Sequence, residues 1–290
     1  MKILLIKDNL HHKNLNFILN CIKIKFTIID NVHHIKDIDL SFFDFVYSPA
    51  EPIDVSQYKN TKFIFGPHFS VFPDDKLNLI KDNKSNVIYF HPSSWTKIAW
   101  YNYDLTLQER LNIIPFSFGV ETNKFINIKS INERNLVFIY FKNRNPEELN
   151  FITNFLNLKN INYTIFQYRY YNENDYLNYL QNSKYGIWIG QHESQGFALE
   201  EALSCDVPLL VWNVTSMNQE YGSTYTDIPA TTIPYWNEKC GEIFYNNNEF
   251  ENKYNSFISN IKNYNPRKYI LDNLSMEICE DNLIKLLNNY

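Results

Sequence analysis

Short runs of apolar, β-branched or aromatic residues recur along the chain, and polar or helix-like segments separate them. Strands that alternate with helices in this way pair in parallel, because each helix serves as the crossover connection to the next strand. The runs that predict strands are residues 2–6, 26–29, 43–47, 62–65, 86–90, 112–116, 135–141, 163–167, 185–189 and 208–212. The repeating pattern therefore predicts an α/β fold built on parallel sheets.

A polar stretch at residues 127–134 interrupts this pattern and divides it into two series. The second series is the more regular one, since helical patterns lie between its strands. The segments that predict helices are residues 146–156, 173–181, 197–204, 250–261 and 276–287. We therefore expect two Rossmann-like domains, residues 1–128 and 129–268, joined near residues 125–134 and followed by a helical segment at 269–290.

Charge and cysteine content disfavour several classes of protein. The net charge is −5 and the pI is about 5.8, whereas a nucleic-acid-binding protein usually presents a basic surface to the phosphates. The four cysteines form no CxxC pair, and their spacing suits neither a zinc site nor a disulfide framework. No apolar run has the length of a signal-peptide core or a transmembrane helix. We expect a cytoplasmic protein with no nucleic-acid partner and no transmembrane segment, for which peripheral membrane contact stays open.

The most informative stretch begins where a predicted strand ends at Gly190 and runs into a helix that starts near Gly196. A glycine at that point lets the backbone approach a ligand closely, and the amides at the start of the helix suit a diphosphate. Glu193 precedes the helix and Glu201 lies inside it, so one carboxylate stands at the mouth of the site and the other more than a turn deeper. A nucleotide sugar needs carboxylates for the hydroxyls at both of its ends and amides for the phosphates between.

Three segments resemble motifs of one enzyme family, in the same order and at the same spacing. Glu193 and Glu201 resemble the Glu-x7-Glu pair of the family-4 retaining glycosyltransferases, and the Ala-Leu-Ser-Cys-Asp-Val-Pro run at 202–208 is similar to the run after the second glutamate in that family. Residues 114–125, Ile-Pro-Phe-Ser-Phe-Gly-Val-Glu-Thr-Asn-Lys-Phe, resemble its domain-junction signature. Residues 92–97, Pro-Ser-Ser-Trp-Thr-Lys, are similar to a third family segment.

The resemblance implies a fold and an activity. The fold would be GT-B, with two Rossmann-like domains facing a deep cleft and a C-terminal helix that returns to the first domain. The activity would be transfer of a hexose from a UDP-, GDP- or ADP-linked nucleotide sugar to a glycan or small-molecule acceptor in glycan biosynthesis. It would retain the anomeric configuration and need no cofactor and no metal.

Two other functional classes stay open. One is a catalytically silent GT-B-like protein that binds carbohydrate or nucleotide, because residues 7–12 after the first strand lack the glycine-rich loop that the family often has there. The other is a sugar-nucleotide epimerase of related fold, although its acid–base pairs are not visible in the sequence. The tripeptide Asp37-Ile38-Asp39 has the form of a DxD metal motif but precedes a strand of the first half, so we assign it no role.

The resemblance also implies residue roles. Glu193 would lie by the hydroxyls of the donor sugar as a catalytic residue, and Glu201 would bind the ribose. Lys142 and Arg144 follow the first strand of the second half and would offset charge on the leaving diphosphate, although solvated loop charges are the alternative. The other residues expected at the donor are His192, Ser194, Gln195, Gly196 and Phe197.

Three further residues are candidates from their place after predicted strands. His68 follows a strand end of the first half, where family members often place a histidine near the acceptor or the transferred sugar, and a simple turn histidine is the alternative. Tyr168 and Arg169 follow the strand at 163–167 and would stack on the base, with an exposed aromatic loop as the alternative. Asp206 stands where the family usually has glycine, a departure that we expect to have no functional effect.

Overall fold

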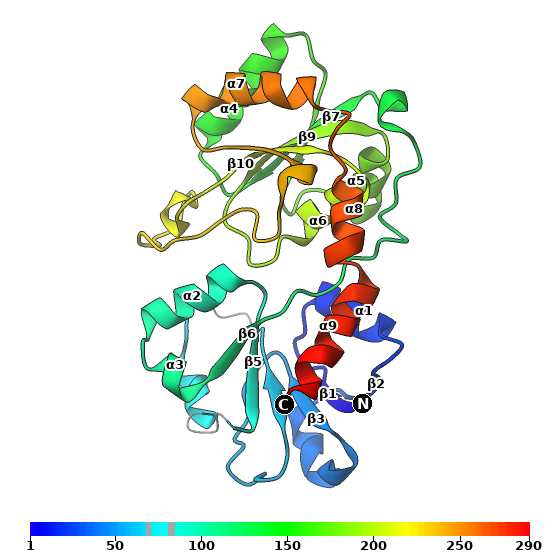
Figure 1. Cartoon of the computed structure of the whole chain (residues 1–290). Helices are drawn as coiled ribbons and strands as arrows, with labels where there is room; N and C mark the ends of the chain where they lie inside the picture. The colour runs from blue at the N-terminus through cyan, green and yellow to red at the C-terminus, as the bar shows by residue number, and fades with distance from the viewer. Residues whose placement is uncertain (68–70, 81–84) are drawn as a thin grey trace. The chain divides into compact units, whose positions relative to one another are not determined.

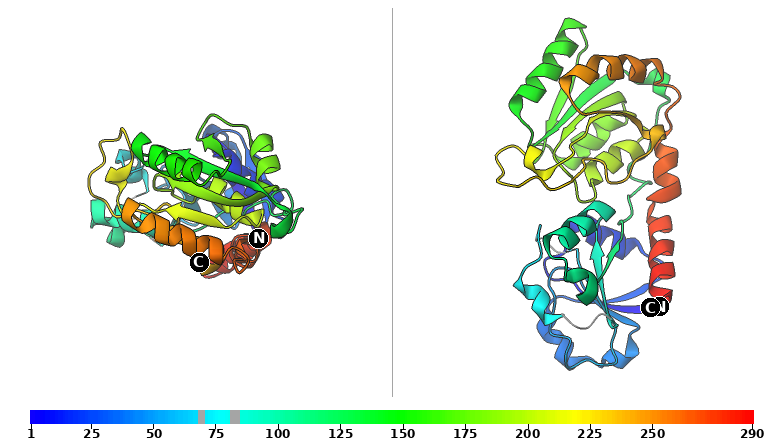
Figure 2. Two further views of the ribbon diagram at one scale, coloured as in Figure 1. Left: turned by 90° about the horizontal axis from the view of Figure 1, so that it is seen from above. Right: turned by 60° about the vertical axis from the view of Figure 1, so that its left-hand side comes forward.

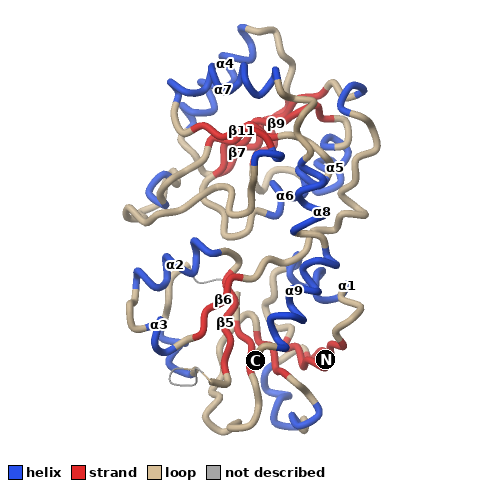
Figure 3. The backbone as a smooth tube through the Cα atoms, viewed as in Figure 1, coloured by secondary structure: helices blue, strands red, loops and turns tan. Residues whose placement is uncertain are grey.

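The chain is described by a computed structural model that covers residues 1–67, 71–80 and 85–290. It forms two compact units: Met1–Gly119 together with Met276–Tyr290, and Val120–Ser275. Each unit contains one parallel sheet whose strands alternate with helices along the chain (Figures 1 and 3). The predicted α/β class with two Rossmann-like units is confirmed.

The sheet of the first unit has the strand order β2-β1-β3-β4-β5-β6, and all neighbours pair in parallel. Its strands are β1 (Lys2–Ile6), β2 (Lys25–Ile29), β3 (Phe45–Ser48), β4 (Phe63–Phe65), β5 (Val87–His91) and β6 (Asn112–Pro115). Its helices are α1 (His12–Asn20), α2 (Ser94–Tyr103), α3 (Leu107–Arg110) and α9 (Met276–Asn288). Every residue of β3, β4 and β5 is buried, because a parallel sheet covered on both faces favours continuous apolar strands.

A buried carboxylate ties the C-terminal helix α9 to the first unit. The side chain of Glu280 accepts hydrogen bonds from the backbone N–H groups of Ile22, Lys23 and Ile24 at 3.2, 2.6 and 3.0 Å. Glu280 is only 3% exposed, and these residues lie between α1 and β2. Both termini consequently end in the same unit, and α9 runs beside α1 (Figures 1 and 2). The predicted return of the last helix to the first unit is confirmed.

The sheet of the second unit has the strand order β11-β10-β9-β7-β8, again parallel throughout. Its strands are β7 (Leu136–Lys142), β8 (Thr164–Gln167), β9 (Ser183–Gly190), β10 (Leu209–Trp212) and β11 (Gly241–Phe244). Its helices are α4 (Pro146–Leu158), α5 (Glu173–Leu180), α6 (Phe197–Ser204), α7 (Asn247–Ser259) and α8 (Pro266–Asn273). Short 3₁₀ turns occur in the two units at Val32–Asp37, Leu40–Phe42, Asp75–Leu79, Ile131–Glu133, Met217–Gln219 and Glu238–Cys240.

The helices of the second unit cover both faces of its sheet. Ile152 of α4 and Phe250 of α7 pack with Ile139 and Ile187 on one face. On the other face, Tyr176 of α5 makes an edge-on contact with the ring of Phe138. Figure 1 shows α4 and α7 on one side of the strands and α5 and α6 on the other. A sheet covered in this way leaves the ends of its strands as the place where a ligand can reach it.

The polar stretch expected to join the two halves belongs to the second unit. Arg134 is 3% exposed, and its guanidinium donates to the carbonyls of Cys205 at 3.0 Å and Asp206 at 2.9 Å, and to that of Lys129. These bonds fix residues 129–134 against the loop that follows α6. The compact unit therefore begins earlier than residues 125–134, at Val120.

Several elements were not among those expected from the sequence, namely α1, α2, α3, α8 and β11. Strand β11 is short, and Gly241 begins it at a φ of 140°. Helix α7 begins earlier than expected because Asn246 accepts hydrogen bonds from the N–H groups of Asn248 and Glu249 and so caps it. In the described part of the chain, every helix is too short or too polar to cross a lipid bilayer.

Replacing Glu280 by alanine should free the amides of residues 22–24. We expect their hydrogen exchange to accelerate and the free energy of unfolding to fall by about 3 kcal/mol, since a hydrogen bond to a charged group contributes about 1.5–3 kcal/mol. Glu277→Ala on the same helix is the control, because that side chain is 78% exposed and should matter little. Exchange at residues 22–24 that is unchanged in Glu280→Ala would rule out the anchor.

Candidate active site

The candidate site lies at the edge of the second sheet where the strand order reverses. The chain runs from β7 outward to β8 on one side, and then returns to β9 on the other side of β7. Lys142 at the end of β7 is paired in register with Gly190 at the end of β9. Loops that leave adjacent parallel strands in opposite directions open a crevice at the carboxyl edge, where ligands of such sheets bind.

Lys142 and Glu193 form an ion pair at this switch point. The Lys142 Nζ donates to both carboxylate oxygens of Glu193 at 2.8 Å, and the two side chains are only 11% and 13% exposed. The same Nζ lies 4.4 Å from the centre of the Tyr168 ring, in the loop after β8. The structure therefore brings together three of the residues that the sequence singled out.

Gly196 shapes the turn from this loop into α6. It caps the helix at a φ of 94°, a left-handed conformation that glycine adopts without steric cost. A Cβ at this position would lie 3.5 Å from the Cβ of Glu193, so the turn holds Glu193 beside the start of the helix. The first amides of a helix have no partner within it and attract anions.

Glu201 lies one turn into α6 and is 5% exposed. Burial raises the pKa of the Tyr171 phenol to about 12, and the carboxylates of Glu201 and Glu193 add to this rise. Both carboxylates thus influence a single phenol. Glu201 is more buried than Glu193, whose side chain is 13% exposed, and the role of the pair at a donor stays a prediction.

Arg144 lies in a different setting from Lys142. Its side chain is 1% exposed, and its guanidinium donates to the carbonyls of Gly190 at 3.1 Å and Trp212 at 3.2 Å and to the carboxylate of Glu148. These bonds tie the segment that follows β7 to the carboxyl ends of β9 and β10. Arg144 therefore stabilises the loops of the site, and its buried guanidinium is not presented to a diphosphate.

The remaining predicted donor residues have different exposures. His192 is partly buried, and burial together with Lys142 lowers its pKa to about 4, so the imidazole is neutral at physiological pH. Ser194 is exposed and Phe197 partly buried, whereas Gln195 is 3% exposed and points inward. Arg169 is exposed at a φ of 69°, with its guanidinium 5.3 Å from the Tyr168 ring. His68 lies outside the described residues.

Glu220 was not found from the sequence and lies in the long loop after β10. His192 Nε2 is 3.6 Å from its carboxylate, and Asn143 Nδ2 is 3.5 Å away. With its amide nitrogen turned toward Glu220, Gln191 donates to both carboxylate oxygens at 3.0 and 3.2 Å. The backbone N–H of Tyr221 donates to the carbonyl of Asn143 at 2.9 Å and holds this loop against the end of β7. No local motif marks Glu220, because only the folding of the loop brings it to the site.

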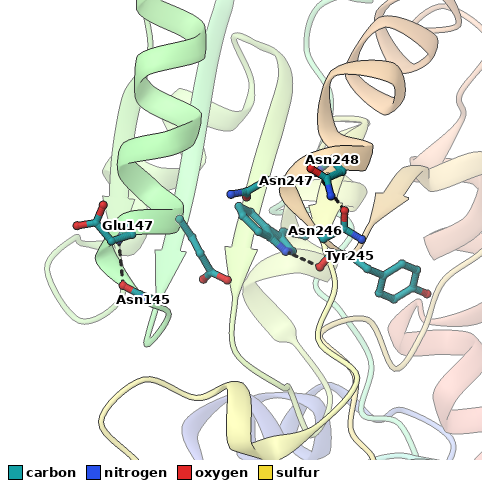
Figure 4. A pocket seen from close by; sticks show the side chains of 8 residues that line it. Asn145, Glu147, Tyr245, Asn246, Asn247 and Asn248 are labelled. Atoms are coloured by element: carbon teal, nitrogen blue, oxygen red, sulfur yellow. Dashed lines mark hydrogen bonds between the residues drawn. The ribbon is translucent and has the colours of Figure 1, made fainter.

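A separate cavity of about 530 Å³ lies between the N-terminal ends of α4 and α7 (Figure 4). Trp212 lines it, and the Nε1 of that residue donates to the carbonyl of Tyr245 at 3.0 Å. The other lining residues are Asn145, Glu147, Glu148, Asn246, Asn247 and Asn248. None of the predicted donor-binding residues lines this cavity.

Comparison with known proteins identifies the fold. No family model and no curated protein matches the sequence. AviGT4, a glycosyltransferase involved in avilamycin A biosynthesis, is 9% identical over 99% of this chain and 97% of its own, with a TM-score of 0.59. The lipopolysaccharide outer core galactosyltransferase WaaB, in its apo form, is 13% identical over 100% and 99% of the two chains, with a TM-score of 0.56. WaaG, a glycosyltransferase involved in lipopolysaccharide biosynthesis, is 10% identical over 99% of each, with a TM-score of 0.51.

At these identities the likeness shows the fold alone, and that fold is the GT-B type predicted from the sequence. Fold does not by itself define an activity, because unrelated functions use the same architecture. The residues at the β7–β9 switch point, and not the fold, therefore determine the chemistry of this chain.

Replacing Arg144 by methionine tests its structural placement. The carbonyls of Gly190 and Trp212 would lose their donor and the carboxylate of Glu148 its cation, so we expect the free energy of unfolding to fall by about 3–5 kcal/mol. Arg169→Met, which removes an exposed guanidinium, is the control and should change stability little. Urea-induced unfolding measures both variants, and a wild-type midpoint for Arg144→Met would contradict the structural role.

Proposed function

We propose that this chain is a glycosyltransferase that transfers a hexose from a nucleotide sugar to a glycan or small-molecule acceptor in the cytoplasm. The reaction would retain the anomeric configuration and need neither metal nor cofactor. The observation that carries the proposal is the grouping of Lys142, Glu193 and Glu201 around the glycine-capped start of α6, at the switch point of a GT-B-type unit. That grouping offers amides and a cation to a diphosphate and carboxylates to the hydroxyls on either side.

In this proposal, the diphosphate of the donor replaces Glu193 as the partner of Lys142. As the bond from the sugar C1 to the diphosphate oxygen breaks, negative charge collects on the leaving phosphate. The Lys142 ammonium and the first amides of α6 are fixed in position beforehand, so they stabilise that charge without reorganising. The acceptor oxygen forms the new bond to C1, and its proton passes to the oxygen of the leaving diphosphate.

The two glutamates then have different tasks. Glu193, released from Lys142, accepts a hydrogen bond from a hydroxyl of the transferred sugar. Glu201, deeper in α6 and near Tyr171, binds the ribose hydroxyls. Glu220, from the loop after β10, lies beside His192 and adds a third carboxylate to the site. Tyr168, already in contact with Lys142 and Arg169, is the aromatic ring available to the base.

A ligand screen tests the proposal. Thermal unfolding in the presence of UDP, GDP and ADP should show stabilisation by one of them, since ligand at about 100 times its Kd adds about 2.7 kcal/mol. Transfer or hydrolysis of the matching nucleotide sugar would establish the enzyme. Binding without either reaction would favour the catalytically silent binding protein. No binding by any of the three would defeat the proposed transferase.

Isosteric replacement of the two glutamates should separate their roles. A contact that strengthens in the transition state affects kcat, whereas one equal in both states affects mainly KM. We expect Glu193→Gln to lower kcat and Glu201→Gln to raise the donor KM, each by roughly tenfold to a hundredfold. Steady-state kinetics with varied donor measures this split. Variants that both retain wild-type parameters would show that the pair is not part of the site.

Chelation should leave the activity intact. Lys142 and the start of α6 supply the positive charge that a divalent ion would otherwise bring to the diphosphate. Among the described residues, no group of three or more His, Cys, Asp or Glu is arranged to hold a metal ion. We expect equal rates with EDTA and with added Mg²⁺ or Mn²⁺. A rate that disappears with EDTA and returns with Mn²⁺ would refute the proposed role of Lys142.

A further inference from the structure

Two buried polar side chains bracket the start of α6 and are not explained by donor binding. The amide nitrogen of Gln195 donates to Oε2 of Glu200 at 3.0 Å. Gln195 is 3% exposed and Glu200 is 1% exposed. Burying polar side chains costs free energy that apolar packing would not cost. A buried polar pair beside a candidate site is therefore a candidate for a functional role.

The hydrogen bond spans the turn on which the site depends. Gln195 immediately precedes Gly196, and the backbone N–H of Glu200 donates to the carbonyl of Gly196 at 3.0 Å. The side-chain bond therefore links the residue before the left-handed glycine to the first turn of the helix after it. Because a Cβ at Gly196 would lie 3.5 Å from the Cβ of Glu193, this turn and Glu193 are neighbours, and a rotation of the turn would displace Glu193 relative to the first amides of α6.

We propose that Glu200 is a positioning residue, whose hydrogen bond with Gln195 fixes the turn at Gly196 and so sets Glu193 and the first amides of α6 for the nucleotide-sugar donor. The inference rests on the proposed function and deepens it. It reassigns Gln195 from ligand contact to support of the loop. Misplacement of reacting groups by about 1 Å can cost on the order of a hundredfold in rate, so this support has a functional effect.

The surroundings of Glu200 favour its neutral form. Burial raises its pKa well above the usual range, and the carboxylates of Glu201 and Glu193 act in the same direction, while the bond from Gln195 opposes them only in part. Burial chiefly raises the pKa of Tyr269 in α8, and the carboxylate of Glu200 adds to this rise. Among the described residues, the buried Oε1 of Glu200 has no hydrogen-bond partner that would stabilise a charge on it.

A pair of variants tests the bond directly. Glu200→Gln keeps a neutral acceptor for Gln195 and should retain the donor KM and kcat of the wild type. The double variant Gln195→Leu with Glu200→Leu replaces the pair by apolar side chains of similar size, which is near-neutral or stabilising for the fold. We expect its melting temperature to be maintained while its donor KM rises at least about tenfold or its kcat falls as much. Wild-type kinetics in the double variant would overturn the proposal, because a merely structural pair predicts that result.

The pH dependence of stability provides a second measurement. An unfolded glutamate loses its proton near pH 4.3, whereas folded Glu200 keeps its proton to higher pH. The wild type should therefore lose stability as pH rises above about 4.3, and Glu200→Gln should lose less over pH 5–8. Identical pH profiles would refute a neutral Glu200, even if the double variant fails to fold.

The same experiments separate this inference from the proposed function. UDP, GDP and ADP, with their sugar conjugates, serve as the probes. A wild type that neither binds nor turns over any of them would contradict the proposed function itself. An active wild type whose double variant is equally active would leave the function standing and remove only the role of the Gln195–Glu200 bond.

Discussion

The parallel pairing of β7 with β9 is the contact on which the candidate site depends. On one face of the sheet, side chains of β7 pack directly against residues of β9. A Cβ on Gly186 would lie 2.3 Å from the ring of Phe138, so glycine makes room for that ring. Tyr140 stacks on Trp188 with ring centres 3.9 Å apart. This packing fixes the register that sets the end of β7 beside the end of β9, from which the loops that carry Lys142 and Glu193 extend.

Lys142 and Arg144 are close together in the chain, but the backbone conformation of the residue between them directs their side chains to different places. Asn143 has a φ of 47°, and on either side of it Lys142 and Arg144 reach different partners. Lys142 meets Glu193 and the Tyr168 ring near the surface, whereas Arg144 is enclosed by carbonyls and Glu148. A buried guanidinium needs these partners, since an unpaired buried charge is costly. The loop therefore combines one cation that stabilises the fold and one cation that pairs with Glu193 at the proposed site.

Much of the architecture could be predicted because its signals are local. The apolar runs of the strands and the capped start of α4, with Asn145, Pro146 and two glutamates, are readable from short windows. The join between the halves was harder, since Arg134 lies in a polar stretch but is buried by contacts with residues 205 and 206. Asp206 stands at a φ of 60°, where glycine would suit, and its carboxylate accepts a hydrogen bond from the N–H of Arg267 at 3.3 Å. No window of sequence contains such a contact.

The sequence by itself determined the α/β class, the two-unit order and the spacing that puts Glu193 before α6 and Glu201 within it, because strand periodicity and helix geometry are properties of neighbouring residues. Only the tertiary structure decided which polar residues are buried and which partners they have. Arg144 is buried by its hydrogen bond to the carbonyl of Gly190, and Gln195 by its hydrogen bond to Glu200 in the first turn of α6. Glu220 reaches the site because its loop is hydrogen-bonded to the backbone of Asn143. The physical reason is that burial and charge pairing are set by residues distant along the chain, and these become neighbours only when the strands of the sheet pair.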